Sequence, residues 1–269
     1  SESLATVGTR LGELVATGAT GYFGSVFQKC DRMFAATEVQ AAALAGYGVR
    51  EVSIVPLGVD LIRFHPEKRS MELRRQLGVP QDALLLFYAG RLDTEKHVHL
   101  LLDAFALLRE IDARLILSGA GPEREALTKR AESFPGVTIL DYQGDPDTLA
   151  RLYASADLYV TAGPHETFGL AVVEAQASGL PVVGVRSGAL IERVPPETGL
   201  LGPVNDAAAM ADHIRTIREN LAAYRAAARR HVELQGYSWE RTFEILFGFY
   251  GEMLAGLPAS GSNHPSSMG

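Results

Sequence analysis

A short segment with two glutamates is the part of the sequence best suited to bind a polar ligand. In order it contains His165, Glu166, Thr167, Phe168, Gly169, Leu170 and, after three more residues, Glu174. Carboxylates accept hydrogen bonds from hydroxyls, so we expect Glu166 (with adjoining His165) to face a sugar and Glu174 to bind a ribose. A helix beginning near residue 169 would offer free amides to a phosphate. Taken alone, two glutamates are better explained as a helix-start carboxylate and a polar residue of an amphipathic helix.

Two cations stand five residues apart in a second segment. Gly90 ends an apolar run, and Arg91 and Lys96 follow it. Arginine presents a planar fork of donors to phosphate oxygens and lysine presents a point charge. Together they could neutralise a diphosphate as its bond to a sugar breaks. Cations in loops are ordinarily solvated at the surface, so the spacing alone does not assign this segment a function.

The elements that must position these side chains follow from the hydrophobic pattern. From about residue 82, short apolar runs alternate with longer helical patterns, which predicts an α/β, doubly wound, Rossmann-like domain with a parallel sheet. Strands are expected at residues 84–89, 114–118, 137–140, 158–162 and 181–185, with others at 52–56 and near 33–37. Helices are expected around residues 100–108, 149–153, 210–217, 221–234 and 239–254. Both polar segments would then lie beyond the carboxyl ends of strands, where such sheets bind ligands.

The two segments together resemble the donor site of retaining GT-B glycosyltransferases of family 4, also called group 1. In that family two glutamates separated by seven residues flank a Phe-Gly pair, as Glu166 and Glu174 do here. The resemblance places the family's diphosphate-binding cations at Arg91 and Lys96. It implies that Glu166, Arg91 and Lys96 are the catalytic residues. The amides of residues 168–170 would then bind sugar and phosphate.

Three weaker matches follow in the family's order. They lie at residues 54–66, 117–122 and 137–144, and they place Gly119 and Tyr142 beside the nucleotide. Two departures are visible: Leu57 stands where Asn is commoner, and His97 follows Lys96 where Gly is usual. These departures leave the local shape of the phosphate loop undetermined.

The resemblance implies a metal-independent, retaining transfer of a hexose from a nucleotide-diphosphate sugar, with GDP-mannose and UDP-hexoses as leading donors. No cofactor is implied besides this donor substrate. In the family the acceptor pocket lies in an N-terminal domain, and the sequence has no room for one before the donor motifs. An alternative of a different class is therefore a nucleotide-sugar-binding module that is inactive without that domain.

This reading divides the chain into four parts. Residues 1–50 would be a connector and remnant of the N-terminal region, and residues 51–235 the donor-binding domain, the C-terminal half of a GT-B fold. Residues 236–256 would form a C-terminal crossover helix. Residues 257–269 are rich in Ser, Gly and Pro, which predicts a disordered tail.

Composition excludes several other classes. The chain has 32 acidic against 25 basic residues, a net charge of -7, which disfavours nucleic acid as a partner. Cys30 is the only cysteine, so no internal disulfide forms and a reducing, cytoplasmic location is expected. No Cys/His cluster predicts a metal site, and no apolar run approaches the ~18 residues of a membrane span. Peripheral contact with a membrane stays open.

A glycine-rich segment favours a third class. Residues 17–24 resemble the glycine fingerprint of short-chain dehydrogenases and epimerases, and Glu38 lies about where such enzymes bind a ribose. Those enzymes also need a Tyr followed four residues later by a Lys, and no tyrosine here has that neighbour. The strand required before residue 17 would be very short. A glycine-rich connector is the better interpretation.

Overall fold

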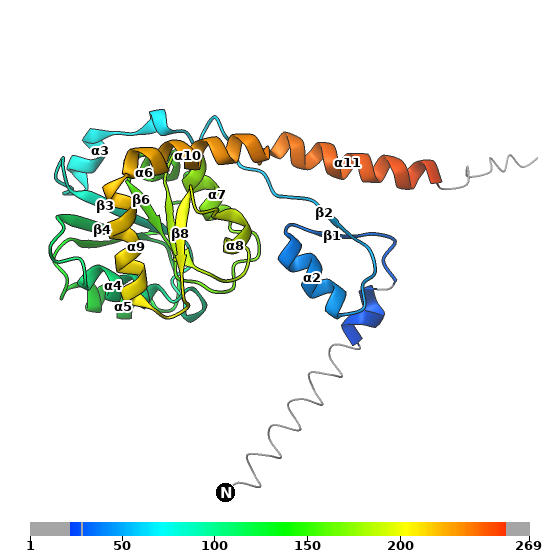
Figure 1. The fold of residues 1–269 in the computed structure, drawn as a ribbon, viewed down its shortest axis with the longest axis horizontal. Helices are drawn as coiled ribbons and strands as arrows, with labels where there is room; N and C mark the ends of the chain where they lie inside the picture. The colour runs from blue at the N-terminus through cyan, green and yellow to red at the C-terminus, as the bar shows by residue number, and fades with distance from the viewer. Residues whose placement is uncertain (1–21, 28, 257–269) are drawn as a thin grey trace, which may run out of the picture.

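The computed structural model of the protein describes residues 22–27 and 29–256. Its centre is a parallel sheet of six strands in the order β5-β4-β3-β6-β7-β8 (Figure 1). The strands are β3 (Leu84–Ala89), β4 (Ala113–Ser118), β5 (Val137–Leu140), β6 (Leu158–Val160), β7 (Val182–Val185) and β8 (Gly199–Gly202). The order runs one way from β3 to β5 and the other way from β6 to β8. The point of reversal therefore lies between β3 and β6, where open sheets of this kind bind ligands.

Helices cover the sheet in two groups. The helices are α3 (Met71–Gln76), α4 (Val98–Ala106), α5 (Arg124–Ala131), α6 (Pro146–Ser155), α7 (Leu170–Ala177), α8 (Leu190–Arg193), α9 (Ala207–Glu219) and α10 (Leu221–Gln235), with 3-10 turns η1 (Pro66–Lys68) and η2 (Thr94–Lys96). Helix α4 packs against α5 and α9, whereas α6 packs against α3 and α7, and α7 against α10 (Figure 1). Layers on both faces explain why Leu85, Leu86 and Leu115 are all almost fully buried. The predicted doubly wound α/β fold is confirmed.

Two strands differ from the expectation. Strand β8 was not predicted, because its sequence Gly-Leu-Leu-Gly has no β-branched residue and carries a glycine at each end. Strand β2 (Val52–Ile54) does form, but it pairs with β1 (Met33–Ala35) in a separate two-stranded parallel sheet rather than with the six-stranded one. The apolar pattern shows that a segment is extended, and it does not show which strand lies beside it.

A second, smaller unit lies beside the large one. It contains β1, α2 (Glu38–Gly46), β2 and the long helix α11 (Trp239–Gly256), and we call these elements the small lobe (Figure 1). The ring of Phe34 in β1 packs 5.3 Å from that of Phe249 in α11, and Arg32 forms an ion pair with Glu252. Residues 32–54 and 239–256 therefore meet in one unit, and the six-stranded domain lies between them in sequence.

The chain passes between the two units twice, and the two passages touch. The amide of Val59 donates to the carbonyl of Tyr237 at 3.1 Å, and the Thr242 hydroxyl donates to the carbonyl of Pro56 at 2.7 Å. A Cβ on Gly58 would lie only 2.1 Å from the amide nitrogen of Trp239. Only glycine allows this approach, so residue 58 fixes how closely the two passages pack. The expected tail at residues 257–269 lies outside the described residues.

Candidate functional site

The loops after β3 and β6 meet at the reversal point of the sheet, and their charged side chains form an ion pair. The Lys96 ammonium nitrogen lies 2.5 Å from a carboxylate oxygen of Glu166. Both side chains are about four-fifths buried, at 18% and 20% exposure. The two segments singled out in the sequence are therefore brought together, although they lie seventy residues apart.

Arg91 does not share in this pair. Its guanidinium contacts Asp93 at 2.6 Å and Glu95 at 2.9 Å, and its side chain is 65% exposed. The backbone around it is held more firmly, since the Tyr88 hydroxyl donates to the Arg91 carbonyl at 2.7 Å. Arg91 thus stands at the rim of the same loop, with two acidic partners that an incoming anion would have to displace.

The neighbouring strand ends leave little space beside this loop. A Cβ on Gly119, after β4, would lie 1.9 Å from the carbonyl oxygen of Gly90, after β3. The two loops pack backbone to backbone at this point, which explains the glycine at residue 119. Tyr142, beyond β5, is 71% exposed and extends the same edge of the sheet.

The segment 164–169, which we call the donor loop, is held in place by hydrogen bonds to its backbone carbonyl groups. The Ser187 hydroxyl donates to the carbonyl of Pro164 at 2.7 Å, and the amide of Ala189 donates to that of Glu166 at 2.9 Å. A Cβ on Gly188, whose φ is 55°, would come within 2.7 Å of the Glu166 carbonyl. The turn after β7 is therefore a cradle for the donor loop.

Two further contacts complete this support. The Thr37 hydroxyl donates to the carbonyl of Thr167 at 3.2 Å, and Arg193 donates to that of Phe168 at 3.2 Å. With the carbonyls engaged on one side, the loop leads into α7 through Gly169 in the left-handed region, at φ 80°. The phenyl ring of Phe168 is buried, whereas His165, Thr167 and Leu170 are exposed.

Sequence reasoning missed the residues of this support. Ser187, Gly188 and Arg193 lie in and after the turn that follows β7, and Thr37 comes from the small lobe. The Ser-Gly pair after a buried strand was a usable signal, because turns at the carboxyl edge of a sheet surround its ligands. Nothing in the sequence distinguishes Arg193 from a solvated arginine, yet it is only 4% exposed.

Glu174 lies one turn into α7 and is mostly buried. Burial raises its pKa to about 7, and the hydroxyl of Tyr153 offsets part of this effect. That hydroxyl is buried and stands near the Glu174 carboxylate, outside the distance and angle of a hydrogen bond. The charge of Glu174 is thus unfavourable until a further donor approaches it.

The conformation of His97 is the one expected of the glycine that is usual at this position. Its φ is 49°, in the left-handed region that favours glycine, and its ring nitrogen Nδ1 lies 2.7 Å from the side-chain oxygen of Asn205. Asn205, at φ 63°, is likewise left-handed. The loop therefore keeps a shape typical of glycine, and the contact between these two side chains compensates for the strain.

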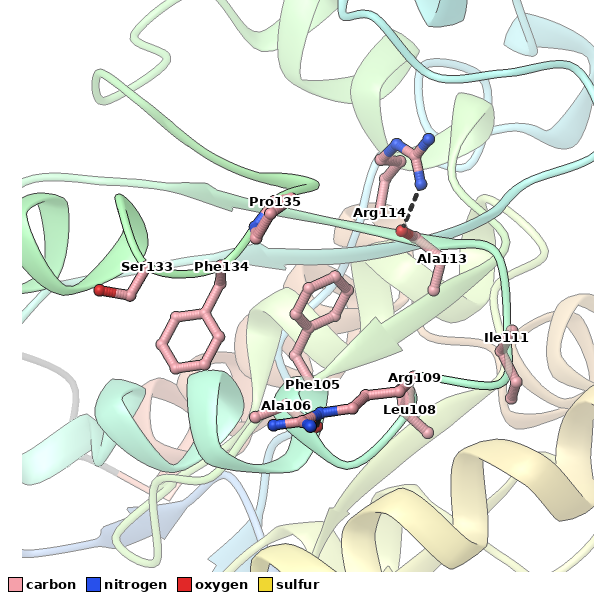
Figure 2. A pocket seen from close by; sticks show the side chains of 10 residues that line it. All are labelled: Phe105, Ala106, Leu108, Arg109, Ile111, Ala113, Arg114, Ser133, Phe134 and Pro135. Carbon is pink, nitrogen blue, oxygen red and sulfur yellow. Dashed lines mark hydrogen bonds between the residues drawn. The ribbon is translucent and has the colours of Figure 1, made fainter.

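A pocket that is partly open to solvent lies at the opposite edge of the sheet. It has a volume of about 360 Å³ and is lined by Phe105, Phe134 and the start of β4, where Arg114 donates to the carbonyl of Ala113 (Figure 2). No sequence-predicted site residue lines it. Since parallel sheets bind ligands at the carboxyl ends of their strands, this cavity is separate from the candidate site.

Residues 22–27 and 29–256 contain no cluster of three His, Cys, Asp or Glu side chains placed to hold a metal ion. No helix described there combines the length and the apolar character needed to cross a bilayer. Most of the glycine fingerprint, residues 17–21, lies outside the described residues, and residues 22–27 are helical.

Comparison with known proteins identifies the family. Residues 70–232 match the family model of glycosyl transferases group 1. A GDP-mannose-dependent alpha-(1-6)-phosphatidylinositol dimannoside mannosyltransferase of Mycobacterium tuberculosis is 37% identical over 209 residues, which cover 77% of this chain and 54% of the relative. A D-inositol 3-phosphate glycosyltransferase of Saccharomonospora viridis is 35% identical over 255 residues, covering 86% and 57%.

A solved structure agrees with the sequence relatives. Sucrose-phosphate synthase from Thermosynechococcus elongatus superposes with a TM-score of 0.77 at 27% identity, covering 87% of this chain and 61% of that one. The chain spans about half the length of the curated relatives it matches. The matched segment contains the Lys96–Glu166 pair and all but Thr37 of the donor-loop support, and it lies beyond the glycine-rich fingerprint. The chain belongs to the glycosyl transferases group 1 family and has the C-terminal half of a GT-B fold.

Proposed function

We propose that this chain binds a nucleotide-diphosphate sugar and provides the donor half of a glycosyltransferase that transfers a hexose to an acceptor. The observation that carries the proposal is the ion pair between Lys96 and Glu166 at the reversal point of the sheet. A cation suited to a diphosphate and a carboxylate suited to sugar hydroxyls thus stand side by side. A donor bound there would have the bond between its sugar and its diphosphate next to both groups.

Each partner of the pair takes its own part of the donor. In the free protein Lys96 and Glu166 neutralise each other, and on binding the ammonium turns to the diphosphate and the carboxylate to the sugar. Arg91 breaks its ion pairs with Asp93 and Glu95 and contacts the phosphates. Glu174 accepts hydrogen bonds from the ribose. The amides at the start of α7 face the sugar and phosphate because the loop carbonyls are engaged behind them.

The chemistry of transfer is part of the same proposal. Lys96, Arg91 and the helix amides stabilise the leaving diphosphate, so the reaction proceeds without a divalent ion. Glu166 orients the sugar, and retention of the anomeric configuration is proposed on the family resemblance. GDP-mannose is the proposed donor, since a relative at 37% identity is named for it, and UDP-hexoses are the alternative.

We propose that transfer needs an N-terminal acceptor domain in addition to this chain. Helix α11 supports this part of the proposal, because exposed aromatic side chains follow one another along one of its faces. They are Trp239, Phe243, Phe247 and Tyr250, each at least 38% exposed. An apolar stripe of this kind marks a surface that a partner covers. A cytoplasmic location completes the proposal.

Calorimetric titration of the chain tests the donor assignment. GDP-mannose, GDP, UDP-glucose and UDP are added in turn, with and without EDTA. We expect one nucleotide pair to bind, EDTA to have no effect, and Lys96→Met to weaken binding at least about tenfold, or 1.4 kcal/mol. Lys68→Met, an exposed lysine on η1, is the matched control and should change nothing. Failure of every nucleotide to bind, or equal behaviour of the two variants, refutes the assignment.

A second assay separates the enzyme from the binding module. The chain is incubated with the nucleotide sugar that it binds, and nucleoside diphosphate release is followed with and without a candidate acceptor. We expect binding without turnover at ordinary enzyme rates. Turnover by the chain alone contradicts the need for an acceptor domain, and binding of NAD(P) instead of a nucleotide sugar revives the dehydrogenase alternative.

A further inference from the structure

One buried guanidinium connects the donor loop to the start of the crossover helix and to the small lobe. Arg193, in α8, donates to the carbonyl of Phe168 at 3.2 Å, to the hydroxyl of Tyr237 at 2.8 Å and to the carbonyl of Ala36 at 3.1 Å. The three acceptors belong to the donor loop, the segment before α11 and the residue after β1. The side chain is 5% exposed, so water cannot replace a lost partner.

Aromatic rings clamp the same guanidinium. Its central carbon lies 4.3 Å from the ring centre of Phe168 and 4.8 Å from that of Tyr237. The planar fork of arginine can stack on rings and donate in its plane at the same time, which a lysine cannot do. The position of Phe168 is therefore tied to that of Tyr237, at the start of the second passage between the two units.

The residue before it makes a parallel connection. The Glu192 carboxylate accepts from the amides of Glu38 and Val39 at 3.2 and 2.8 Å, and so caps the start of α2. Thr37, the adjacent helix-capping residue, donates to the donor loop at the carbonyl of Thr167. Helix α8 thus contacts the donor loop on one side and the start of α2 on the other.

We propose that Arg193 is a positioning residue that couples the donor loop to the small lobe. The sugar part of the donor is then recognised only when the small lobe keeps its position against the six-stranded domain. The inference rests on the proposed function, and it assigns a separate task to this side chain. The donor loop contacts chiefly the sugar, whereas the main contacts to the phosphates and the ribose come from Lys96, Arg91 and Glu174, none of which Arg193 touches. Loss of Arg193 should therefore weaken sugar recognition and spare the nucleotide.

The test compares a nucleotide with its sugar conjugate on the full chain. GDP and GDP-mannose, and in parallel UDP and UDP-glucose, are titrated into wild type and Arg193→Met. We expect the ratio of the two dissociation constants to shift by about tenfold against the sugar conjugate, with the affinity for the free nucleotide changed by less than about threefold. Arg229→Met is the matched control, because Arg229 also donates to three carbonyls but at the far end of α7.

A milder pair of variants keeps the test decisive if Arg193→Met does not fold. Thr37→Val removes the hydroxyl that donates to the donor loop, and Thr37→Ser retains it. We expect Val to shift the same ratio in the same direction and Ser to restore it. A merely structural role would lower thermal stability and leave the ratio unchanged.

The outcomes distinguish this inference from the proposed function. If wild type binds a nucleotide and its sugar conjugate but the Arg193 and Thr37 variants leave their ratio unchanged, the coupling is refuted and the donor site stands. An equal loss of both ligands also refutes it, since the nucleotide was to be spared. If wild type binds neither ligand, the proposed function falls and the inference falls with it.

Discussion

The ionisation of Glu174 gives a quantitative test of the site. Burial raises its pKa from an ordinary 4.5 to about 7. The folded protein therefore binds this proton more tightly than the unfolded chain. The resulting stabilisation is fully present below pH 4.5 and is lost as the pH rises through 7. Since one pKa unit corresponds to 1.36 kcal/mol, the loss between pH 4 and pH 8 is about 3 kcal/mol.

Glu174→Gln removes the titrating group and keeps the shape of the side chain. Urea unfolding is measured for wild type and variant between pH 4 and pH 8, and the difference between their free energies of unfolding cancels the contributions of other groups. We expect this difference to move by about 3 kcal/mol in favour of the variant as the pH rises. The exposed Glu125→Gln is the control and should give a flat difference. A flat difference for Glu174→Gln as well would refute the argument.

Ligand binding should reveal the same proton. Ribose hydroxyls donate to the carboxylate form, so binding a nucleotide favours ionisation and releases a proton below about pH 7. The affinity of wild type is then expected to rise between pH 5.5 and 7.5, in calorimetry repeated in buffers of different ionisation enthalpy. A proton release that persists in Glu174→Gln would assign it to another group.

Two further substitutions test the frame that holds the site. Arg74→Met removes a guanidinium that is 1% exposed and pairs with a buried aspartate, so it should lower the free energy of unfolding by about 3 kcal/mol, whereas Arg75→Met, its exposed neighbour, should cost little. Gly58→Ala places a Cβ 2.1 Å from the Trp239 amide nitrogen and should destabilise by about 1–3 kcal/mol in urea unfolding, whereas Gly46→Ala meets no atom within 4 Å and should be neutral or slightly stabilising. Equal effects within either pair would contradict the packing described above.

The six-stranded sheet was largely predictable because its central strands are buried on both faces. Strand β3 is a run of apolar residues ending at Gly90, and β6 and β7 are similar, so length and flanking residues were enough. Strand β8 lacks those features, and its pairing with β7 is decided by tertiary contacts. The separate pairing of β2 with β1 could not be predicted either, since an apolar pattern does not show which strand lies beside it.

The candidate site was predictable in its chemistry and less so in its geometry. Spacing and residue type singled out Lys96 and Glu166, but only the fold shows that they neutralise each other in the free protein. Arg193 could not be predicted from the sequence. Its helix has only four residues, which is too short for a hydrophobic pattern to show whether the arginine faces the core or the solvent. Its burial depends on Phe168 and Tyr237, which are distant in sequence.

The contact between the two passages at Pro56–Val59 and Tyr237–Thr242 has a mechanical consequence. The small lobe is attached to the six-stranded domain at this crossing and again at α8, where Glu192 and Arg193 bind residues 36–39. Two separate attachments fix an orientation that one alone would not, so turning the small lobe about the crossing would have to break the contacts at α8. Tyr237 belongs to both, since its carbonyl accepts from Val59 and its hydroxyl accepts from Arg193.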